Sequence, residues 1–324
     1  MVKMRFGIYY TGLDDPAGPI PFAKRVEDLG FDGLWAGEAP TNRAPVGAPV
    51  SDTFTTLCFA AAATSRITVG SNVILLPLHH PAWVAMRWGT LDVLSKGRSI
   101  LGIGAGGEYP KQFEAFGVRV ENRGKQTDEC LEVIKNLWTE PVSNYKGRFF
   151  QFDGITMGKP FNKPHPPIWV GGRPGGIELD SQGKPRYKSK TGAMKRAAKY
   201  GDAWCPYYMT VETYRDSRDQ VKSYAKEIGR DISKMVWALY THIWIRDSYE
   251  EALRAAAGKM RYGRDLAKKI EGYDILGTPK DIIPRIEKYA EAGVDHLILN
   301  VHAPPGQVYN HLKVLAEEIV PHFQ

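Results

Sequence analysis

Four titratable side chains lie within or just after predicted strands, where a protein of alternating strands and helices can carry its catalytic residues. Glu38 and Glu108 each follow a short apolar run. His80 directly precedes Pro81 at the start of a predicted helix, and His242 lies within an apolar run. Carboxylates and imidazoles exchange protons near neutral pH, so these four are candidate catalytic residues. Structural interpretations stay open beside the catalytic one: His80 as a helix cap, Glu108 as a solvated loop carboxylate and His242 as a hydrogen-bonded core histidine.

Two glycine-rich segments also follow apolar runs. Residues 102–107 formally contain the GxGxxG fingerprint, but Pro110 and a long stretch precede the next long helix, whereas a dinucleotide fingerprint opens a helix at once. Residues 171–172 are glycines, and residues 191–192 open a helix after a basic loop. Glycine lets a flat ring or a phosphate approach the backbone, and a helix N-terminus binds anions. A tight turn with a solvated insertion is the structural alternative for the second segment.

Eight apolar runs separated by amphipathic, helix-length stretches must position these residues. The expected strands are 4–10, 32–37, 67–75, 98–104, 167–171, 202–206, 235–245 and 295–302. Three of them follow a helix-to-strand joint in which a helix-ending glycine (Gly30, Gly201 or Gly293) is followed closely by aspartate. Glycine can end a helix in the left-handed conformation. Eight such units predict an α/β fold, a closed (β/α)₈ TIM barrel whose chemistry lies on the loops after the strands.

We expect one barrel domain over residues 1–324, with insertions at its C-terminal mouth. Between the fourth and fifth strands, at about 141–166, the sequence predicts a hairpin turning at Lys146-Gly147 and then a proline-rich connector. Long loops in a compact domain tend to be lids or binding surfaces. The long loops expected here are 38–52, 105–121, 173–190 and 261–278.

Composition narrows the class of protein. The formal charge of +7 is dispersed along helices among Glu and Asp, which argues against nucleic-acid binding, although the excess can attract an anionic ligand. The chain starts without an apolar signal segment, and no apolar run reaches the roughly 18 residues of a membrane span, so we expect a cytoplasmic location. The three cysteines show no CxxC spacing, and we expect them in the core rather than in a metal site.

An ordered set of motifs resembles the luciferase-like flavin oxidoreductase superfamily. The motifs are ITVG at 67–70, LPLHHP at 76–81, TLDVLSKGR at 90–98, GIGAG at 102–106, HPPIWVGG at 165–172 and RAAKYGDAW at 196–204. The resemblance extends from Phe6 to about Pro206. It implies a (β/α)₈ barrel that uses reduced FMN and oxygen as a monooxygenase, or the deazaflavin coenzyme F420 in hydride transfer.

The resemblance also implies roles for individual residues. It implies a cis peptide bond between Asn72 and Val73 under the flavin ring. It implies that Ala105 and Gly106 contact the ring edge. The residues that it implies for the cofactor phosphate are Gly171, Gly172, Thr191 and Gly192.

The choice of cofactor stays open. Deazaflavin-using members often carry an Asp-His pair after the second strand, where this chain has Gly37 and Glu38. This difference favours reduced FMN, while the basic loop at 173–190 could hold the acidic tail of the deazaflavin coenzyme. As a monooxygenase the chain would receive reduced flavin from a separate flavin reductase, and the resemblance implies a homodimer.

We expect an apolar or aromatic small molecule as substrate. Aromatic residues near strand ends could line its pocket, or could equally be core; they are Trp35, Trp83, Tyr109 and Phe113. Two alternatives from other classes remain: a barrel hydrolase with Glu38 and Glu108 as an acid/base pair, and a flavin-binding protein without turnover.

Overall fold

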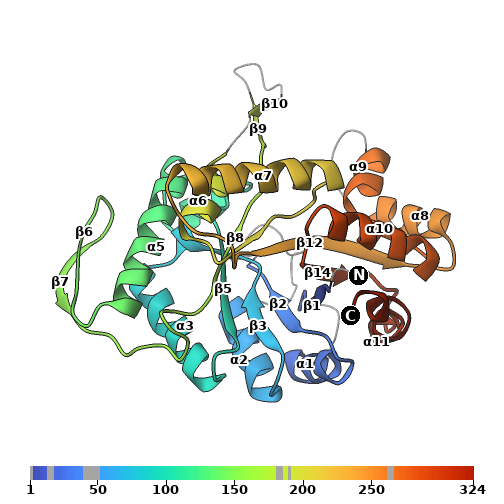
Figure 1. Ribbon diagram of the computed structural model, residues 1–324, viewed down its shortest axis with the longest axis horizontal. Helices are drawn as coiled ribbons and strands as arrows, with labels where there is room; N and C mark the ends of the chain where they lie inside the picture. Colours follow the sequence, from blue (N-terminus) through green and yellow to red (C-terminus); the bar gives the residue numbers. More distant parts are fainter. Residues whose placement is uncertain (1–2, 13–17, 39–51, 180–184, 189–190, 261–265) are drawn as a thin grey trace.

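Eight parallel strands close into a barrel in the computed structural model of this chain, as the sequence predicted (Figure 1). The structure describes residues 3–12, 18–38, 52–179, 185–188, 191–260 and 266–324. In order around the barrel, the strands are β1 (Arg5–Tyr9), β2 (Gly33–Ala36), β3 (Thr68–Ser71), β5 (Ser99–Gly104), β8 (Ile168–Gly171), β11 (Ala203–Cys205), β12 (Val236–Ile245) and β14 (His296–Val301). β14 pairs with both β12 and β1, which closes the ring.

Helices cover the outside of the barrel, one after each barrel strand. They are α1 (Pro19–Asp28), α2 (Thr53–Ala63), α3 (Pro81–Leu94), α5 (Arg123–Thr139), α6 (Gly192–Tyr200), α7 (Val211–Glu227), α10 (Pro279–Glu291) and α11 (Val308–Val314), the last continued by η3 (Leu315–Ile319) and η4 (Val320–Phe323). The apolar stripe expected on α5 is buried against the barrel, including Leu131, Ile134 and Leu137. Among the described residues, no helix has both the length and the apolar character needed to cross a membrane.

Shorter elements are inserted between these units. They are β4 (Ile74–Leu75), η1 (Leu76–Leu78), α4 (Pro110–Ala115), η2 (Val120–Asn122), β6 (Ser143–Lys146), β7 (Gln151–Ile155), β9 (Gly176–Leu179), β10 (Pro185–Lys188), α8 (Tyr249–Lys259), α9 (Leu266–Tyr273) and β13 (Ile275–Gly277). The hairpin expected near 141–166 is β6 and β7, which pair antiparallel and stand out beside α5 (Figure 1).

Three of the expected long loops contain elements that the sequence did not predict. The segment 105–121 holds α4 and begins η2, 173–190 holds the β9–β10 hairpin, and 261–278 holds α9 and β13. β13 has three residues and pairs with the end of β12, so its partner is fixed by the barrel and not by a local pattern. Residues 39–51 of the fourth loop lie outside the described residues.

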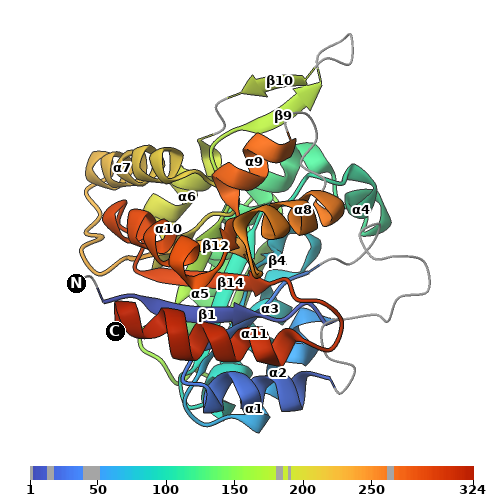
Figure 2. The same ribbon diagram turned by 90° about the vertical axis from the view of Figure 1, so that its right-hand side faces the viewer.

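The two ends of the barrel are distinguished in Figure 2. β1 starts on the side where both chain ends lie and runs toward the side where α4 lies. The α4 side is therefore the mouth at the C-terminal ends of the strands, where barrels of this kind carry their sites. The β9–β10 hairpin projects away from the barrel in both views.

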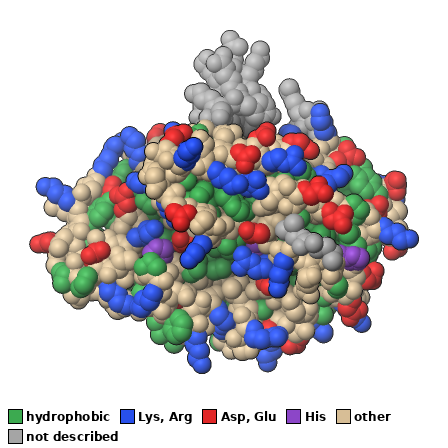
Figure 3. Space-filling view, viewed as in Figure 1, with side chains coloured by type: hydrophobic (Ala, Val, Ile, Leu, Met, Phe, Trp, Pro, Cys, Tyr) green, Lys and Arg blue, Asp and Glu red, His purple; other side chains and the backbone are tan. Residues whose placement is uncertain are grey.

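The surface agrees with the expected dispersal of charge. On the face in Figure 3, Lys and Arg side chains are interspersed with Asp and Glu side chains.

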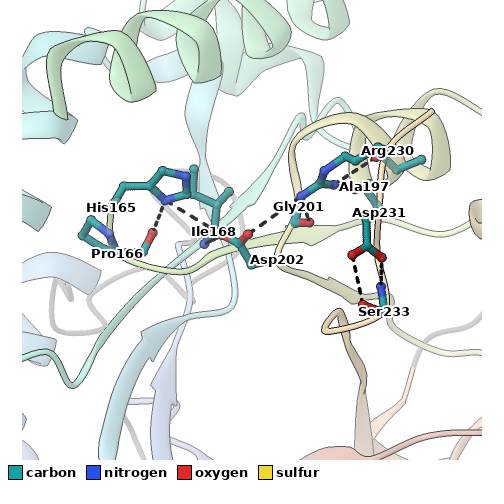
Figure 4. A network of polar contacts seen from close by, with 10 residues as sticks. His165, Pro166, Ile168, Ala197, Gly201, Asp202, Arg230, Asp231 and Ser233 are labelled. Carbon is teal, nitrogen blue, oxygen red and sulfur yellow. Dashed lines mark hydrogen bonds and ion pairs between the residues drawn. The ribbon is translucent and has the colours of Figure 1, made fainter. Parts of the chain in front are cut away.

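The aspartates of the three helix-to-strand joints share one structural role. Asp32 Oδ2 accepts a hydrogen bond of 2.7 Å from the Phe6 amide, and Asp202 Oδ2 accepts one of 2.8 Å from the Ile168 amide. Asp295 does the same for β12, with an amide–carboxylate distance of 3.1 Å. Each carboxylate therefore fastens the start of its own strand to the start of a neighbouring strand. Figure 4 shows the joint at Asp202.

The left-handed conformation that lets glycine end a helix occurs at two of the three joints. Gly30 and Gly293 have φ values of 82° and 92°, whereas Gly201 has φ −80°. At Gly201 the requirement is steric, because a Cβ would lie 2.8 Å from the Ala203 carbonyl oxygen and 3.0 Å from that of Ala197. Crowding rather than backbone conformation explains the third glycine.

Trp35 fills the interior of the barrel. A Cβ added at Gly7 or at Gly70 would lie 2.3 Å from its ring, so both glycines make room for it. The Trp169 ring packs on Trp35 at 4.5 Å between centroids, and His296 meets Trp35 edge-on at 5.7 Å. Trp35 is fully buried, so the interpretation that places it in the barrel core is confirmed.

All three cysteines are free, and Cys130 and Cys205 are buried while Cys58 is half-buried. Burial raises the pKa of the Cys130 thiol to about 12, so this side chain is an uncharged core residue at neutral pH.

Candidate functional site

A cis peptide bond joins Asn72 and Val73 at the mouth, where the resemblance implied one. The bond lies in a bulge between β3 and β4. The Asn72 amide donates to the Ala36 carbonyl at 2.7 Å, and the Val73 carbonyl accepts from the Glu38 amide at 3.0 Å. These two bonds tie the bulge to the end of β2, so its position follows that of a barrel strand.

Val73 explains two glycines of the neighbouring strands. A Cβ at Gly104 would lie 2.7 Å from Val73 Cγ2, and one at Gly171 would lie 2.8 Å from Val73 Cγ1. A Cβ at Gly102 would lie 1.7 Å from the Ser71 carbonyl oxygen. These glycines are therefore required by packing inside the chain, and the backbone at Gly104 and Gly171 is covered by Val73 rather than bare.

Glu38 is held by two partners. Its Oε2 accepts from the Leu75 amide at 2.7 Å, and its Oε1 lies 2.6 Å from His79 Nε2. The Glu38 side chain is 10% exposed. A carboxylate engaged in this way braces β4 and the bulge. The sequence analysis missed His79, although it is adjacent to His80.

His80 contacts different elements from those that Glu38 contacts. Its Nδ1 accepts from the Ala82 amide at 3.3 Å, which caps α3. Its exposed ring meets the Phe150 ring edge-on, with centroids 5.4 Å apart. The structure thus gives His80 the contacts of a helix cap packed against the β6–β7 hairpin.

Glu108, Tyr207 and Arg173 form a polar group at the rim of the mouth. The Tyr207 hydroxyl donates to the Glu108 carboxylate. The Arg173 guanidinium lies 5.1 Å from the Tyr207 ring centroid, and its Nη1 donates to the Tyr208 carbonyl at 3.1 Å. Burial, with the nearby Glu108 charge, raises the pKa of Tyr207, so its hydroxyl stays protonated. The group connects the ends of β5, β8 and β11.

His242 lies in a buried chain of hydrogen bonds. Its Nε2 is 2.6 Å from the Tyr208 hydroxyl, and its Nδ1 is 2.6 Å from His302 Nε2. Burial lowers the pKa of His242 to about 3 and that of His302 to about 2, so both rings are neutral at pH 7. The sequence analysis singled out His242 and missed Tyr208 and His302.

The aromatic side chains at the mouth differ from those expected. Phe113 is fully buried, Trp83 is 57% exposed on α3 and Tyr109 is 39% exposed. Five tyrosines form a connected aromatic cluster at the mouth instead: Tyr9, Tyr207, Tyr208, Tyr240 and Tyr273. The mouth is therefore lined by rings that each carry one hydroxyl group.

The N-terminus of α6 offers an anion site beside the end of β8. Thr191 makes no side-chain capping bond, the first turn has no acidic residue, and a Cβ at Gly192 would meet nothing within 4 Å. Gly172 has φ 108° and packs against Ala193. The basic side chains expected in the loop before Thr191 lie outside the described residues. Free amides at a helix start can bind a phosphate.

A comparison with protein families shows to which family this chain belongs. The family described as luciferase-like monooxygenase matches residues 5–179. The chain belongs to this family.

Relatives within the luciferase-like family include both a reductase and a monooxygenase. The 5,10-methylenetetrahydromethanopterin reductase of Archaeoglobus fulgidus is 28% identical over 330 residues, which cover 93% of this chain and 94% of the reductase. The 4-hydroxyprotoasukamycin monooxygenase of Streptomyces nodosus subsp. asukaensis is 28% identical over 292 residues, which cover 86% of this chain and 73% of the monooxygenase.

The barrel is shared with a solved structure of the coenzyme F420-dependent tetrahydromethanopterin reductase from Methanopyrus kandleri. The TM-score is 0.78 at 19% identity, and the superposition covers 100% of both chains. This chain is therefore a luciferase-like oxidoreductase of the flavin- or F420-dependent kind.

Proposed function

We propose that this luciferase-like oxidoreductase is a monooxygenase that uses reduced FMN and O₂ on an apolar or aromatic small molecule. The observation that carries the proposal is the chemistry of the mouth. The carboxylates of Glu38 and Glu108 are both engaged by hydrogen-bond partners, and His242 is neutral. Such a site positions a substrate and leaves the demanding chemistry to a cofactor.

The residues of the mouth fit a flavin. The bulge at Asn72-Val73 would support the ring, and Ala105 and Gly106 would contact its edge. The phosphate would bind the open start of α6; its proposed ligands are Gly171, Gly172, Thr191 and Gly192. Reduced FMN held there would supply the two electrons that activate O₂, so that one oxygen atom would enter the substrate and the other would leave as water. The tyrosine cluster would exclude water and contact the apolar substrate.

Hydride transfer with F420 is the second candidate. The reductase of Archaeoglobus fulgidus matches 93% of this chain, which favours a reductase over a monooxygenase. In that case a separate flavin reductase, which the monooxygenase needs as its source of reduced FMN, would have no role.

Parallel titrations separate the candidates. The chain is titrated with reduced FMN under nitrogen, with oxidised FMN and with F420, and binding is followed by fluorescence. We expect reduced FMN to bind at least tenfold more tightly than the other two, and oxygen uptake to depend on added apolar substrate. Preference for F420 would replace the monooxygenase with the hydride-transfer enzyme. Tight binding of FMN with no substrate-dependent oxygen uptake would indicate a flavin-binding protein without turnover.

Gly192→Asp tests the phosphate site at α6. Aspartate in the first turn suits a helix and a Cβ meets nothing there, so the free energy of unfolding should not fall. Its charge repels the phosphate, and we expect the dissociation constant of the cofactor to rise at least tenfold, which is about 1.4 kcal/mol. Gly192→Asn, which has the same shape and no charge, is the control. Equal affinity for both variants and the parent would place the phosphate elsewhere.

A further inference from the structure

Tyr208, His242 and His302 form a continuous chain of hydrogen bonds that the proposed function does not use. The distances are 2.6 Å from the Tyr208 hydroxyl to His242 Nε2 and 2.6 Å from His242 Nδ1 to His302 Nε2. The Trp244 ring stacks on His302 at 4.1 Å between centroids, and the Tyr208 ring stacks on His242 at 4.9 Å. Each histidine ring therefore has one stacked aromatic neighbour, which restricts its rotation.

The protons of this hydrogen-bonded chain can be arranged in only two orders, one for each direction of donation. Each neutral imidazole carries one N–H, and each of the two contacts needs one proton between its two atoms. Either Tyr208 donates to His242, which donates to His302, or His302 donates to His242, which donates to Tyr208. Burial keeps both rings neutral, and the positive charges of Lys259 and Arg246 oppose protonation further. In the second order the Tyr208 O–H points to a partner other than His242.

Tyr208 connects this chain to the proposed cofactor site. It lies at the C-terminal end of β11, three residues after Cys205, whose thiol is 3.6 Å from Asn72 Oδ1. Its ring contacts Tyr240, which contacts Tyr9 at 4.9 Å between centroids. The Tyr9 hydroxyl and the Asn72 carbonyl oxygen border the same space beside Gly37. Tyr208 therefore belongs to the same aromatic cluster at the mouth as Tyr9, which borders the bulge of the cis peptide bond.

We propose that Tyr208 is a catalytic acid that gives a proton to an oxyanion formed on the substrate, and that His242 and His302 are positioning residues that relay the replacement proton from solvent. This inference rests on the proposed oxidoreductase function, whichever of the two cofactors is bound. Tyr208, His242 and His302 are all uncharged before and after the step.

The step moves one proton and no electrons. The Tyr208 O–H bond breaks as the substrate O–H bond forms. The His242 Nε2–H bond breaks as the tyrosine O–H bond re-forms, and the His302 Nε2–H bond breaks as a bond forms to His242 Nδ1. His302, which is 7% exposed, takes a proton from water at Nδ1. The chain ends in the other of its two orders. After the product has left, the chain resets by the reverse shift, in which the Tyr208 oxygen takes a proton from water at the mouth and His302 Nδ1 returns one to solvent.

The first test needs no turnover. In the ¹⁵N-histidine-labelled full chain, we expect NMR to show that His242 and His302 are neutral from pH 8 to pH 5 and that each ring exchanges between its two tautomers. Tyr208→Phe should leave both rings neutral and freeze one tautomer of His242. A single fixed tautomer in the parent protein, or a protonated ring at pH 6, would overturn the relay.

The second test measures the proton step in H₂O and D₂O with an apolar ketone as substrate, either during reoxidation of bound reduced FMN by O₂ or, if F420 is the cofactor, during oxidation of bound reduced F420 by the ketone. Tyr208→Phe should slow the step about 100-fold, and His302→Gln about tenfold, with the cofactor dissociation constant unchanged. We expect the dependence of the rate on deuterium content to be curved in the parent, as for several protons in motion, and linear in His302→Gln.

Tyr145→Phe is the control, because the Tyr145 hydroxyl is also hydrogen-bonded to a side chain, the Glu132 carboxylate, but belongs to the β6–β7 hairpin outside the barrel. It should leave the rate and the isotope effect unchanged. A Tyr208→Phe rate within twofold of the parent, with the same isotope effect, would overturn the catalytic role. Absence of turnover with either cofactor in the parent would instead reject the proposed function, and the NMR result would still decide the relay.

Discussion

Acidification from pH 7 to pH 4 should unfold this protein through three buried histidines. His242, His302 and His296 have pKa values lowered to about 3, 2 and 3, in each case mainly because burial disfavours the charged ring. Both ring nitrogens of His296 are buried without a hydrogen-bond partner in the described structure, between Trp35 and Trp169. A proton could bind any of the three only with loss of packing or of the hydrogen-bonded chain.

The sign and size of the change in the free energy of unfolding with pH follow from proton linkage. In the unfolded chain each histidine titrates near pH 6.5, whereas the folded chain takes up these protons only near pH 3 or below. Below pH 6.5 the unfolded state therefore binds more protons, and the free energy of unfolding falls as the pH falls. Each histidine contributes about 1.4 kcal/mol per pH unit, so three contribute about 4 kcal/mol per pH unit. A fold whose free energy of unfolding is about 5–15 kcal/mol at neutral pH therefore unfolds after acidification by a few pH units.

Urea unfolding at a series of pH values between 7.5 and 4.5 measures this slope. His296→Met, which fills the same space with an uncharged side chain, should reduce the slope by about 1.4 kcal/mol per pH unit. His322→Gln, at an exposed site near the C-terminus, should leave it unchanged. Constant stability between pH 6.5 and pH 5 in the parent protein would show that the folded state protonates these rings without cost.

The parts of the fold that the sequence predicted are those with a local signal. Alternating apolar runs and amphipathic stretches predicted the eight barrel strands, and the hairpin of β6 and β7 was recognisable from its turn. Gly30 and Gly293 marked helix ends through a backbone conformation that glycine favours. These features depend on residues close together in the chain, so one sequence suffices to find them.

The site was only partly predictable because its contacts join distant strands. β12 and β14 pair with His242 opposite Asn300, and this register brings His302 to His242 across 60 residues of sequence. The bond of Glu38 to His79 likewise depends on how β4 follows the bulge. Apolar neighbours around His242 signalled a buried ring, but no local pattern could name its partners.

Gly171→Ala should weaken cofactor binding by at least 30-fold, which is about 2 kcal/mol. The added Cβ would lie 2.8 Å from Val73 Cγ1 and 3.1 Å from the Ile103 carbonyl oxygen. The carbonyl belongs to a barrel strand, so Val73 must move, and with it the cis bulge that we propose supports the ring. Gly171 has no left-handed φ, so alanine itself fits the backbone there.

A double-mutant cycle separates displacement of Val73 from general damage. Val73→Ala removes the methyl group that the new Cβ would meet, so the double variant should bind the cofactor within about threefold of Val73→Ala alone, a coupling of roughly 1–2 kcal/mol. Gly258→Ala on α8 is the matched control, because its Cβ meets nothing within 4 Å and the residue lies outside the proposed cofactor site. Additive losses in the double variant would show that the steric conflict lies with Ile103 and not with Val73. A Gly171→Ala variant that binds like the parent would show that the position of the bulge does not determine how the cofactor binds.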